Sequence, residues 1–307
     1  MIWEKLGFLW SAEQHLPWGS MGTLTPTPIR IDVDTIRVFC GIRDHSGVAR
    51  IGYFDICSHD PTKVMAYSNT PVLDIGEPGA FDDNGMLLGD VIDVDGELRM
   101  YYVGFQLATK AKFLAFGGLA TSRDGGRTFV RKFRTPVIDR DDSGLFIRAI
   151  HSIRRLSDGS YRAWYSEGCS WEIIYGKPFP NYNIAVVDSP DGFRFDANQG
   201  AAVALGREEE YRIGRSRVFE WSPDRYIMSF TFGTREGVYE SGYATSSDMS
   251  SWYRQDNFGL SPGPDSFDSR HLAYPAVFRA SDGQVFCLYN GNDMGGGGIG
   301  LARSIEF

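Results

Sequence analysis

The sequence predicts an all-β protein that folds as a single five-bladed β-propeller over residues 1–307, with a funnel-shaped pocket at its centre. The first observation behind this prediction is a strand-like segment of alternating aromatic and aliphatic residues that recurs about every 60 residues, close to the period of a propeller blade. Its copies end at Cys40, Tyr102, Tyr165, Phe230 and Tyr289. Because one copy is expected in each blade, the repeat predicts five blades.

A second strand-like element follows each copy. It recurs at 51–54, 118–122, 185–189, 242–246 and 300–304. After the second and third of these elements come Asp-Gly turns, which are typical of hairpin connections.

A third element precedes the recurring segment. It is a short apolar strand that ends in an Asp-Gly-type turn, as in 91–96, 153–159 and 277–283, and a fourth strand is expected in segments such as 129–137. In a propeller, small antiparallel sheets are arranged around an axis, so the same order of strands recurs in every blade. The alternative, a β-sandwich, does not predict such a repeat.

Composition and charge exclude several classes of protein. With 36 Gly, 14 Pro and 42% hydrophobic residues, the chain is typical of a strand-rich globular protein, and its formal charge of -8 argues against a nucleic-acid partner. No stretch reaches the roughly 18 apolar residues of a membrane span, so we expect a cytoplasmic protein without a membrane partner. The cysteines are far apart, and Cys40 and Cys287 fall in strand patterns where buried thiols are expected.

The repeat also predicts which residues line the pocket. The innermost strand of a propeller blade begins at the central channel, so residues just before these strands share one funnel. The equivalent points of the five units are Pro26, Leu88, His151, Ser216 and Pro275.

Arginines near these points predict a cationic funnel in an acidic protein. Because a guanidinium group suits carboxylates and phosphates, the expected ligand is an anionic sugar, a sugar phosphate or a nucleotide sugar. The alternative is that the arginines pair with carboxylates and tie blades together. The candidate binding residues are Thr25, Arg148, Arg215, Arg217, Asp268, Arg270 and Tyr274.

Four residues are candidates for acid–base chemistry. Asp82 and Asp83 form a carboxylate pair near the channel mouth, and glycosidic cleavage usually needs an acid and a base or nucleophile. For His151 and His271 we expect titration near neutral pH, which would suit an acid or a base. The alternatives are an Asx turn for the aspartates and structural hydrogen bonds for the histidines.

Two further carboxylates lie where strands end. Asp44 is expected in a hairpin turn, although it and Arg43 could face the funnel, and Glu167 follows the third copy of the recurring segment. We include both as candidate binding residues.

Several segments carry a resemblance to a known family. They are Trp3–Gly7, 43–52, Phe81–Gly85, Tyr274–Phe278, 289–292 and 298–302. On these segments the chain resembles the five-bladed propellers of the glycoside hydrolase superfamily that groups arabinanase-, invertase- and mannoside-phosphorylase-like proteins. It looks most like the uncharacterised hydrolase-like propellers associated with bacterial polysaccharide assembly.

The chain departs from that family at the catalytic positions. Where arabinanase-like members carry two aspartates and a glutamate, this sequence has Thr25, Ile150 and Gly214, and the invertase-like motifs are missing. The resemblance therefore implies the fold and a carbohydrate-like ligand rather than standard hydrolysis.

Three functions remain open at this point. The first is a glycosidase- or phosphorylase-like enzyme in which Asp82 or Asp83 is the acid or base and the cations hold an anionic group. The second is a non-hydrolytic enzyme of modified-sugar or secondary-metabolite biosynthesis, and the third is a non-catalytic glycan-binding propeller. No cofactor and no metal site are predicted, although a structural ion in the channel is left open.

Overall fold

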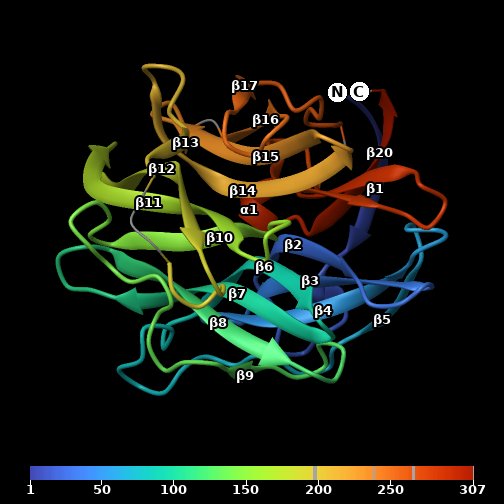
Figure 1. The fold of residues 1–307 in the computed structure, drawn as a ribbon, viewed down its shortest axis with the longest axis horizontal. Helices are drawn as coiled ribbons and strands as arrows, with labels where there is room; N and C mark the ends of the chain where they lie inside the picture. Colours follow the sequence, from blue (N-terminus) through green and yellow to red (C-terminus); the bar gives the residue numbers. More distant parts are fainter. Residues whose placement is uncertain (196–198, 238, 265–266, 307) are drawn as a thin grey trace.

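The computed structural model describes residues 1–195, 199–237, 239–264 and 267–306. These residues are nearly all in β-strands and connecting loops, as predicted, and the strands are arranged around a centre (Figure 1). In this part of the chain no helix is long and apolar enough to cross a membrane.

The strands form three hydrogen-bonded sheets. The first contains, in spatial order, β1 (Ile2–Trp10), β20 (Ile299–Glu306), β19 (Val285–Asn290) and β18 (Ala273–Arg279). The second contains β2 (Thr23–Arg30), β3 (Thr35–Arg43), β4 (Ala49–Cys57) and β5 (Val64–Tyr67).

The third sheet is longer. It runs in spatial order through β17 (Tyr253–Gln255), β16 (Tyr239–Ser246), β15 (Arg225–Thr234), β14 (Glu210–Ser222), β12 (Lys177–Ser189), β11 (Tyr161–Ile174), β10 (Ile147–Arg155), β8 (Phe113–Ser122), β7 (Glu97–Leu107) and β6 (Met86–Val94). Beside this path, β13 (Ala201–Val203) pairs with β12, and β9 (Val130–Arg131) pairs with β8. All copies of the recurring segment lie in strands, namely β3, β7, β11, β15 and β19.

The two ends of the chain share a sheet. β1 pairs antiparallel with β20, with Trp3 opposite Ser304 and Phe8 opposite Gly300. Figure 1 accordingly shows the N- and C-termini next to each other. Hydrogen bonds between the first and last strands therefore hold the chain ends together, a pairing that the sequence repeat did not predict.

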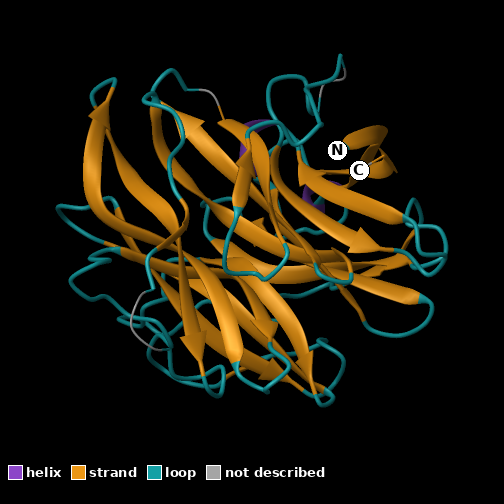
Figure 2. Cartoon of the chain, turned by 45° about the horizontal axis from the view of Figure 1, so that its top comes forward, coloured by secondary structure: helices purple, strands orange, loops and turns teal. Residues whose placement is uncertain are grey.

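Five strands, here called the inner strands, contact one another in a ring. β2 contacts β6, β6 contacts β10, β10 contacts β14, β14 contacts β18, and β18 contacts β2. The tilted view shows that almost the whole chain consists of strands joined by loops (Figure 2). Within the long sheet only short parallel contacts, β8 with β10 and β12 with β14, connect the antiparallel groups.

Apolar layers lie between neighbouring groups of strands. In the layer between the first and second sheets, the rings of Trp10 and Phe54 stack with their centroids 4.6 Å apart, and both side chains are buried. Cys40 and Cys287 are also buried, as predicted, and burial raises the pKa of both thiols. These two cysteines are therefore unreactive core residues.

Candidate functional site

Every inner strand is irregular at the same place. The register shifts in β2 between Leu24 and Thr27, and in β6, β10, β14 and β18 it shifts around Gly89, His151, Arg215 and Tyr274 respectively. A bulge leaves residues unpaired with the neighbouring strand and redirects their side chains. The equivalent points predicted from the repeat lie at or beside these bulges.

Three of the predicted site residues adopt a rare backbone conformation in these bulges. Thr25, Arg215 and Tyr274 have φ angles of 54°, 58° and 56°, in the left-handed region that is unfavourable for residues other than glycine. All three line the narrow channel between the inner strands, where only about 20 Å³ is open. The bulges thus bring residues that are far apart in sequence to one place.

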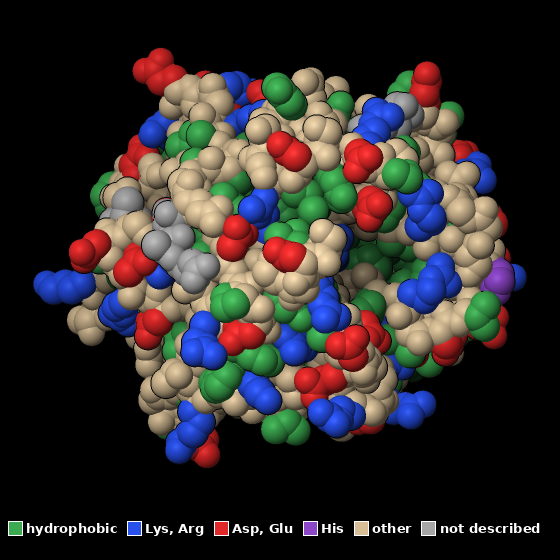
Figure 3. Space-filling view, in the orientation of Figure 1, with side chains coloured by type: hydrophobic (Ala, Val, Ile, Leu, Met, Phe, Trp, Pro, Cys, Tyr) green, Lys and Arg blue, Asp and Glu red, His purple; other side chains and the backbone are tan. Residues whose placement is uncertain are grey.

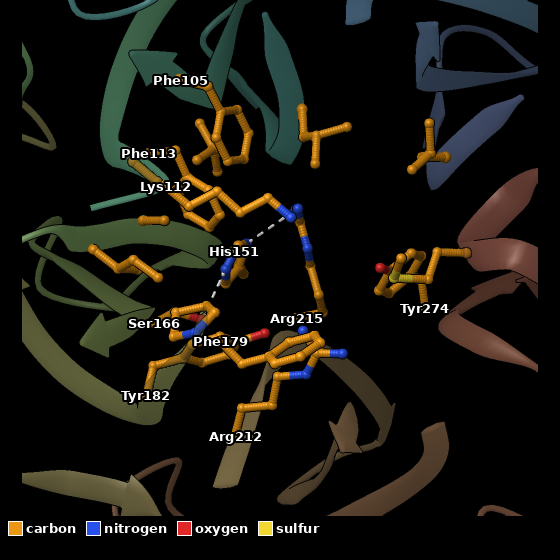
Figure 4. Close-up of a pocket in the computed structure, with 18 of the residues that line it drawn as sticks. Phe105, Lys112, Phe113, His151, Ser166, Phe179, Tyr182, Arg212, Arg215 and Tyr274 are labelled. Carbon is orange, nitrogen blue, oxygen red and sulfur yellow. Dashed lines mark hydrogen bonds between the residues drawn. The ribbon is translucent and has the colours of Figure 1, made fainter. Parts of the chain in front are cut away.

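A cavity of about 330 Å³, here called the central cavity, widens from this channel (Figure 4). Its polar lining residues are Arg43, Lys112, His151, Ser166, Tyr182, Arg212, Arg215, Tyr239 and Tyr274. Its apolar lining residues are Leu24, Leu87, Val103, Phe105, Phe113, Ala115, Ile147, Ala149, Pro178, Phe179, Pro180 and Met294, the last from the short segment α1 (Asn292–Gly295).

The central cavity is cationic, and none of its cations has a carboxylate partner within the described part of the chain. Among the described residues, no Asp or Glu lines it, and the side chains of Arg43, Lys112 and Arg212 make no hydrogen bond or ion pair. The Nε atom of Arg212 is buried and has no acceptor among the residues that the structure describes. Its guanidinium group lies 4.9 Å and 4.8 Å from the ring centroids of Tyr211 and Tyr239. Lys, Arg, Asp and Glu side chains are by contrast intermixed over the face shown in Figure 3.

Arg215, His151 and Ser166 form a chain of hydrogen bonds at the wall of the cavity (Figure 4). Arg215 Nη1 lies 3.4 Å from His151 Nδ1, and His151 Nε2 lies 3.0 Å from Ser166 Oγ. Because a guanidinium group can only donate, His151 Nδ1 must accept, so the ring proton is on Nε2 and is donated to Ser166. The hydroxyl hydrogen of Ser166 then remains available for a group in the cavity.

His151 is neutral in this arrangement. Burial lowers the pKa of His151 well below its ordinary value, and the positive charges of Arg215 and Arg217 lower it further. A neutral imidazole fits the tautomer deduced above, since an imidazolium would place a third positive charge beside two guanidinium groups.

We expect the folded protein to lose stability through His151 as the pH falls. In the unfolded chain the histidine binds a proton below its ordinary pKa of about 6.5, whereas the folded protein keeps it neutral, so acid favours unfolding. From about pH 7.5 to about pH 5.5 the free energy of unfolding should fall by about 1.4 kcal/mol more in the wild type than in His151→Gln. Urea denaturation of both proteins at the two pH values measures this difference, and equal pH dependence would contradict it.

Asp82 and Asp268 lie inside their blades rather than in the central cavity. Asp82 Oδ2 accepts hydrogen bonds from Tyr102 (3.0 Å) and Arg131 Nε (2.8 Å). Asp268 is placed in the same way: its Oδ2 accepts from the Tyr289 hydroxyl at 3.1 Å and pairs with Lys5 at 2.5 Å. Both aspartates therefore anchor a tyrosine in a strand that carries the recurring segment, Tyr102 in β7 and Tyr289 in β19.

Asp83 and Asp44 lie in turns. Asp83 accepts a hydrogen bond from the backbone N–H of Gly79 at 2.8 Å. Asp44 accepts from the N–H groups of Ser46 and Val48 and pairs with Arg50 at 2.6 Å. These contacts match the turn alternative considered for both residues.

Arg148 and Glu167 lie next to each other across β10 and β11, outside the central cavity. Arg148 pairs with Asp141 at 2.6 Å, and Glu167 accepts hydrogen bonds from Tyr165 (2.7 Å) and Ser143. Both side chains thus have partners that hold a loop against the strands.

Arg270 and His271 line a different cavity, of about 580 Å³, and Arg270 forms an ion pair with Asp293. Arg217 and Thr25 line the narrow channel. Arg217 pairs with Asp90 at 3.3 Å and also faces a cavity of about 440 Å³ at the other end of the channel. Of the predicted site residues, the central cavity therefore brings together His151, Arg215 and Tyr274, and it is also lined by Arg43, which was considered as facing the funnel.

Several lining residues were not predicted, Arg212, Ser166, Tyr182 and Tyr239 among them. Arg212 lies two residues before Gly214 on β14, and Tyr182 comes from the long β11–β12 hairpin. In the described part of the chain, no three His, Cys, Asp or Glu side chains gather closely enough to hold a metal ion.

Comparison with sequences gives two relatives. The chain is 28% identical over 303 residues to the uncharacterized proteins Rv1502 and MT1551 of Mycobacterium tuberculosis, strains ATCC 25618 / H37Rv and CDC 1551 / Oshkosh, with 98% of this chain and 99% of each relative covered. No protein-family model matches the chain.

Comparison with solved structures shows the fold. A glycoside hydrolase matches with a TM-score of 0.73 and 16% identity over 99% of this chain and 92% of its own. A thermostable family-43 glycoside hydrolase matches with a TM-score of 0.66 and 17% identity over 94% and 92% of the two chains. A protein of the GH130 family of mannoside phosphorylases and glycoside hydrolases matches with a TM-score of 0.66 and 15% identity over 93% of this chain and 85% of its own. The predicted glycoside hydrolase-like β-propeller fold is thereby confirmed.

Proposed function

We propose that the central cavity binds an anionic sugar or sugar-like molecule, such as a sugar acid, a sugar phosphate or a nucleotide sugar. The observation that carries this proposal is the set of cations, Arg43, Lys112, Arg212 and Arg215, that line the cavity without any carboxylate partner among the described residues. Arg43, Arg212 and Arg215 are half-buried, and charges partly removed from water are unfavourable unless they are paired, so the cavity favours an anion; Lys112, which is exposed, adds to the positive charge at its edge. The glycoside hydrolase-like fold supports a carbohydrate as the rest of the ligand.

We further propose that the chain is one domain of five blades. The ring of contacts β2–β6–β10–β14–β18 supports this number, and each inner strand would begin one blade. The bulges would then place one irregular segment of every blade at the central channel.

Hydrolysis by two carboxylates does not fit the central cavity. Glycosidases of that type need an acid and a base or nucleophile from Asp or Glu, and no described lining residue is either. At Gly214, where the resemblance would place a glutamate, a Cβ atom would lie 2.5 Å from Ser166 Oγ and 2.8 Å from the Tyr182 ring. Ser166 and Tyr182 thus occupy the space that such a side chain needs.

A non-hydrolytic enzyme is the second candidate, and the hydrogen-bond chain to Ser166 favours it. In this role Arg215, the neutral His151 and the Ser166 hydroxyl would stabilise negative charge that develops on a bound substrate. Donors that are already fixed in position are suited to this task because they need no reorganisation during the reaction.

Isothermal titration calorimetry with glucose, glucose 1-phosphate and glucuronic acid tests the proposed function. We expect an anionic sugar to bind and glucose not to bind, with affinity that falls as salt is added. Equal binding of glucose and the anions, or no binding of either anion, would contradict the proposal. Incubating the bound sugar with the protein and following it by NMR then separates an enzyme from a binding protein.

A further inference from the structure

The central cavity has two different sides. On one side the rings of Phe105 and Phe113 line it beside Lys112, and on another lie Arg212 and Tyr182, with Arg215 between them in the view of Figure 4. The two phenylalanine rings are only partly buried and meet edge to face with centroids 5.4 Å apart. The molecule therefore offers a ligand both an aromatic wall and a cationic wall.

The aromatic wall is held firmly in place. Phe113 packs edge to face on Trp171 at 5.4 Å, and Trp171 in turn packs on Phe146 at 4.9 Å. Phe179, from the β11–β12 hairpin, lines the same cavity. Aromatic side chains supported in this way are preorganised to stack against a flat apolar group.

The cavity has few side chains suited to reading many sugar hydroxyls. Among its described lining residues there is no Asp, Glu, Asn or Gln, and the side-chain hydroxyls are those of Ser166, Tyr182, Tyr239 and Tyr274. Most lining residues are apolar. A volume of about 330 Å³ is at the lower end of the range for sites that take drug-sized ligands.

We infer that the ligand of the central cavity carries an aromatic ring next to its anionic sugar part. The inference rests on the proposed function, because the cationic wall supplies the anion site. The anionic group is held by Arg212 and Arg215, and the aromatic ring lies against Phe105 and Phe113. Both an aryl glycoside and a nucleoside have this shared chemistry.

Two matched pairs of probes test the inference by calorimetry. One pair is methyl β-D-glucuronide and 4-nitrophenyl β-D-glucuronide, and the other is ribose 5-phosphate and uridine 5′-phosphate. In at least one pair we expect the aromatic member to bind about 10-fold more tightly than its partner, as stacking on an aromatic wall provides. The pair that shows the preference identifies an aryl group or a nucleobase as the source.

Variants separate the aromatic wall from the cationic wall. Phe113→Leu should remove most of the aromatic preference, while the non-aromatic member of the pair binds as it does to the wild type. If Phe113→Leu does not fold, Phe105→Leu serves as the test variant. Phe133→Leu, at a partly exposed phenylalanine outside the cavity, is the matched control and should change nothing. Arg212→Gln should weaken both members of a pair equally.

The outcomes distinguish the two proposals. Anions that bind through Arg212 without preference for the aromatic member in either pair would overturn this inference and leave the proposed function intact. An aromatic preference that survives both Phe113→Leu and Phe105→Leu would also overturn this inference. If none of the four probes binds, both the inference and the proposed function are contradicted.

Discussion

Replacing Arg212 by glutamine is expected to weaken the binding of an anionic sugar about 100-fold, which corresponds to ~2.7 kcal/mol. The guanidinium group of Arg212 has no ion pair or hydrogen bond with the described residues, and its Nε atom is buried. Its contacts with the described residues are the rings of Tyr211 and Tyr239, 4.9 Å and 4.8 Å from the guanidinium group, so the substitution removes a charge that no described carboxylate balances. Glutamine keeps much of the length of the side chain, so the folded structure should change little.

Calorimetric titration and thermal unfolding of the variant check this expectation together. Arg123→Gln is the control, because Arg123 is largely exposed, pairs with Glu97 and lies outside the cavity. The Arg123→Gln protein should bind the anionic sugar with the affinity of the wild type. An Arg212→Gln protein of normal stability that binds the anion as tightly as the wild type would show that the anion lies elsewhere.

Replacing Gly89 by alanine is expected to destabilise the fold by about 4 kcal/mol or more. Gly89 lies at the bulge of β6, where a Cβ atom would be 2.0 Å from the carbonyl oxygen of Ile150 and 2.7 Å from that of Tyr101. Both obstacles are backbone atoms, one in the neighbouring inner strand β10 and one in β7, which pairs with β6, so no side-chain movement relieves the overlap. Urea denaturation measures the loss, and failure of the variant to fold is its extreme form.

Gly296→Ala is the matched control for this substitution. Gly296 has helical φ and ψ angles of -62° and -28°, and a Cβ atom there would come no closer than 3.1 Å to a neighbouring atom. A change of less than about 1 kcal/mol is expected. If Gly89→Ala were equally mild, the inner strands would not approach each other as closely as described.

The strand order and the equivalent points of the five units could be predicted because they depend on a pattern that the chain repeats, whereas the bulges at these points were not predicted. Apolar and aromatic residues recur with similar spacing, and in each copy consecutive residues are buried, so both faces of these strands pack in the interior. The pairing of β1 with β20 could not be predicted in this way, because it joins segments from opposite ends of the chain.

The site was predicted only in part, for reasons that particular residues show. Selection of residues next to the bulges found His151, Arg215 and Tyr274 but missed Arg212, which lies three residues before Arg215, near the start of β14. The wall built by the β11–β12 hairpin was missed because the length of that hairpin is peculiar to one unit.

Asp82 and Asp268 were predicted to belong to the site but lie outside the central cavity. Each follows a phenylalanine and accepts a hydrogen bond from a tyrosine that ends a copy of the recurring segment. A carboxylate that recurs in the same setting in two units is more typical of the scaffold than of a single site. The repeat itself therefore contained the signal that these aspartates are structural anchors.

An anomalous difference map from crystals soaked in selenate tests the central claim most directly, because selenate is a dianion shaped like phosphate and its selenium can be located without ambiguity. We predict a peak inside the central cavity, within hydrogen-bond distance of the guanidinium group of Arg212 or Arg215, and no such peak in crystals of Arg212→Gln. Peaks confined to the outer surface or to the arginines at the other end of the channel, with none in the central cavity, would contradict the account.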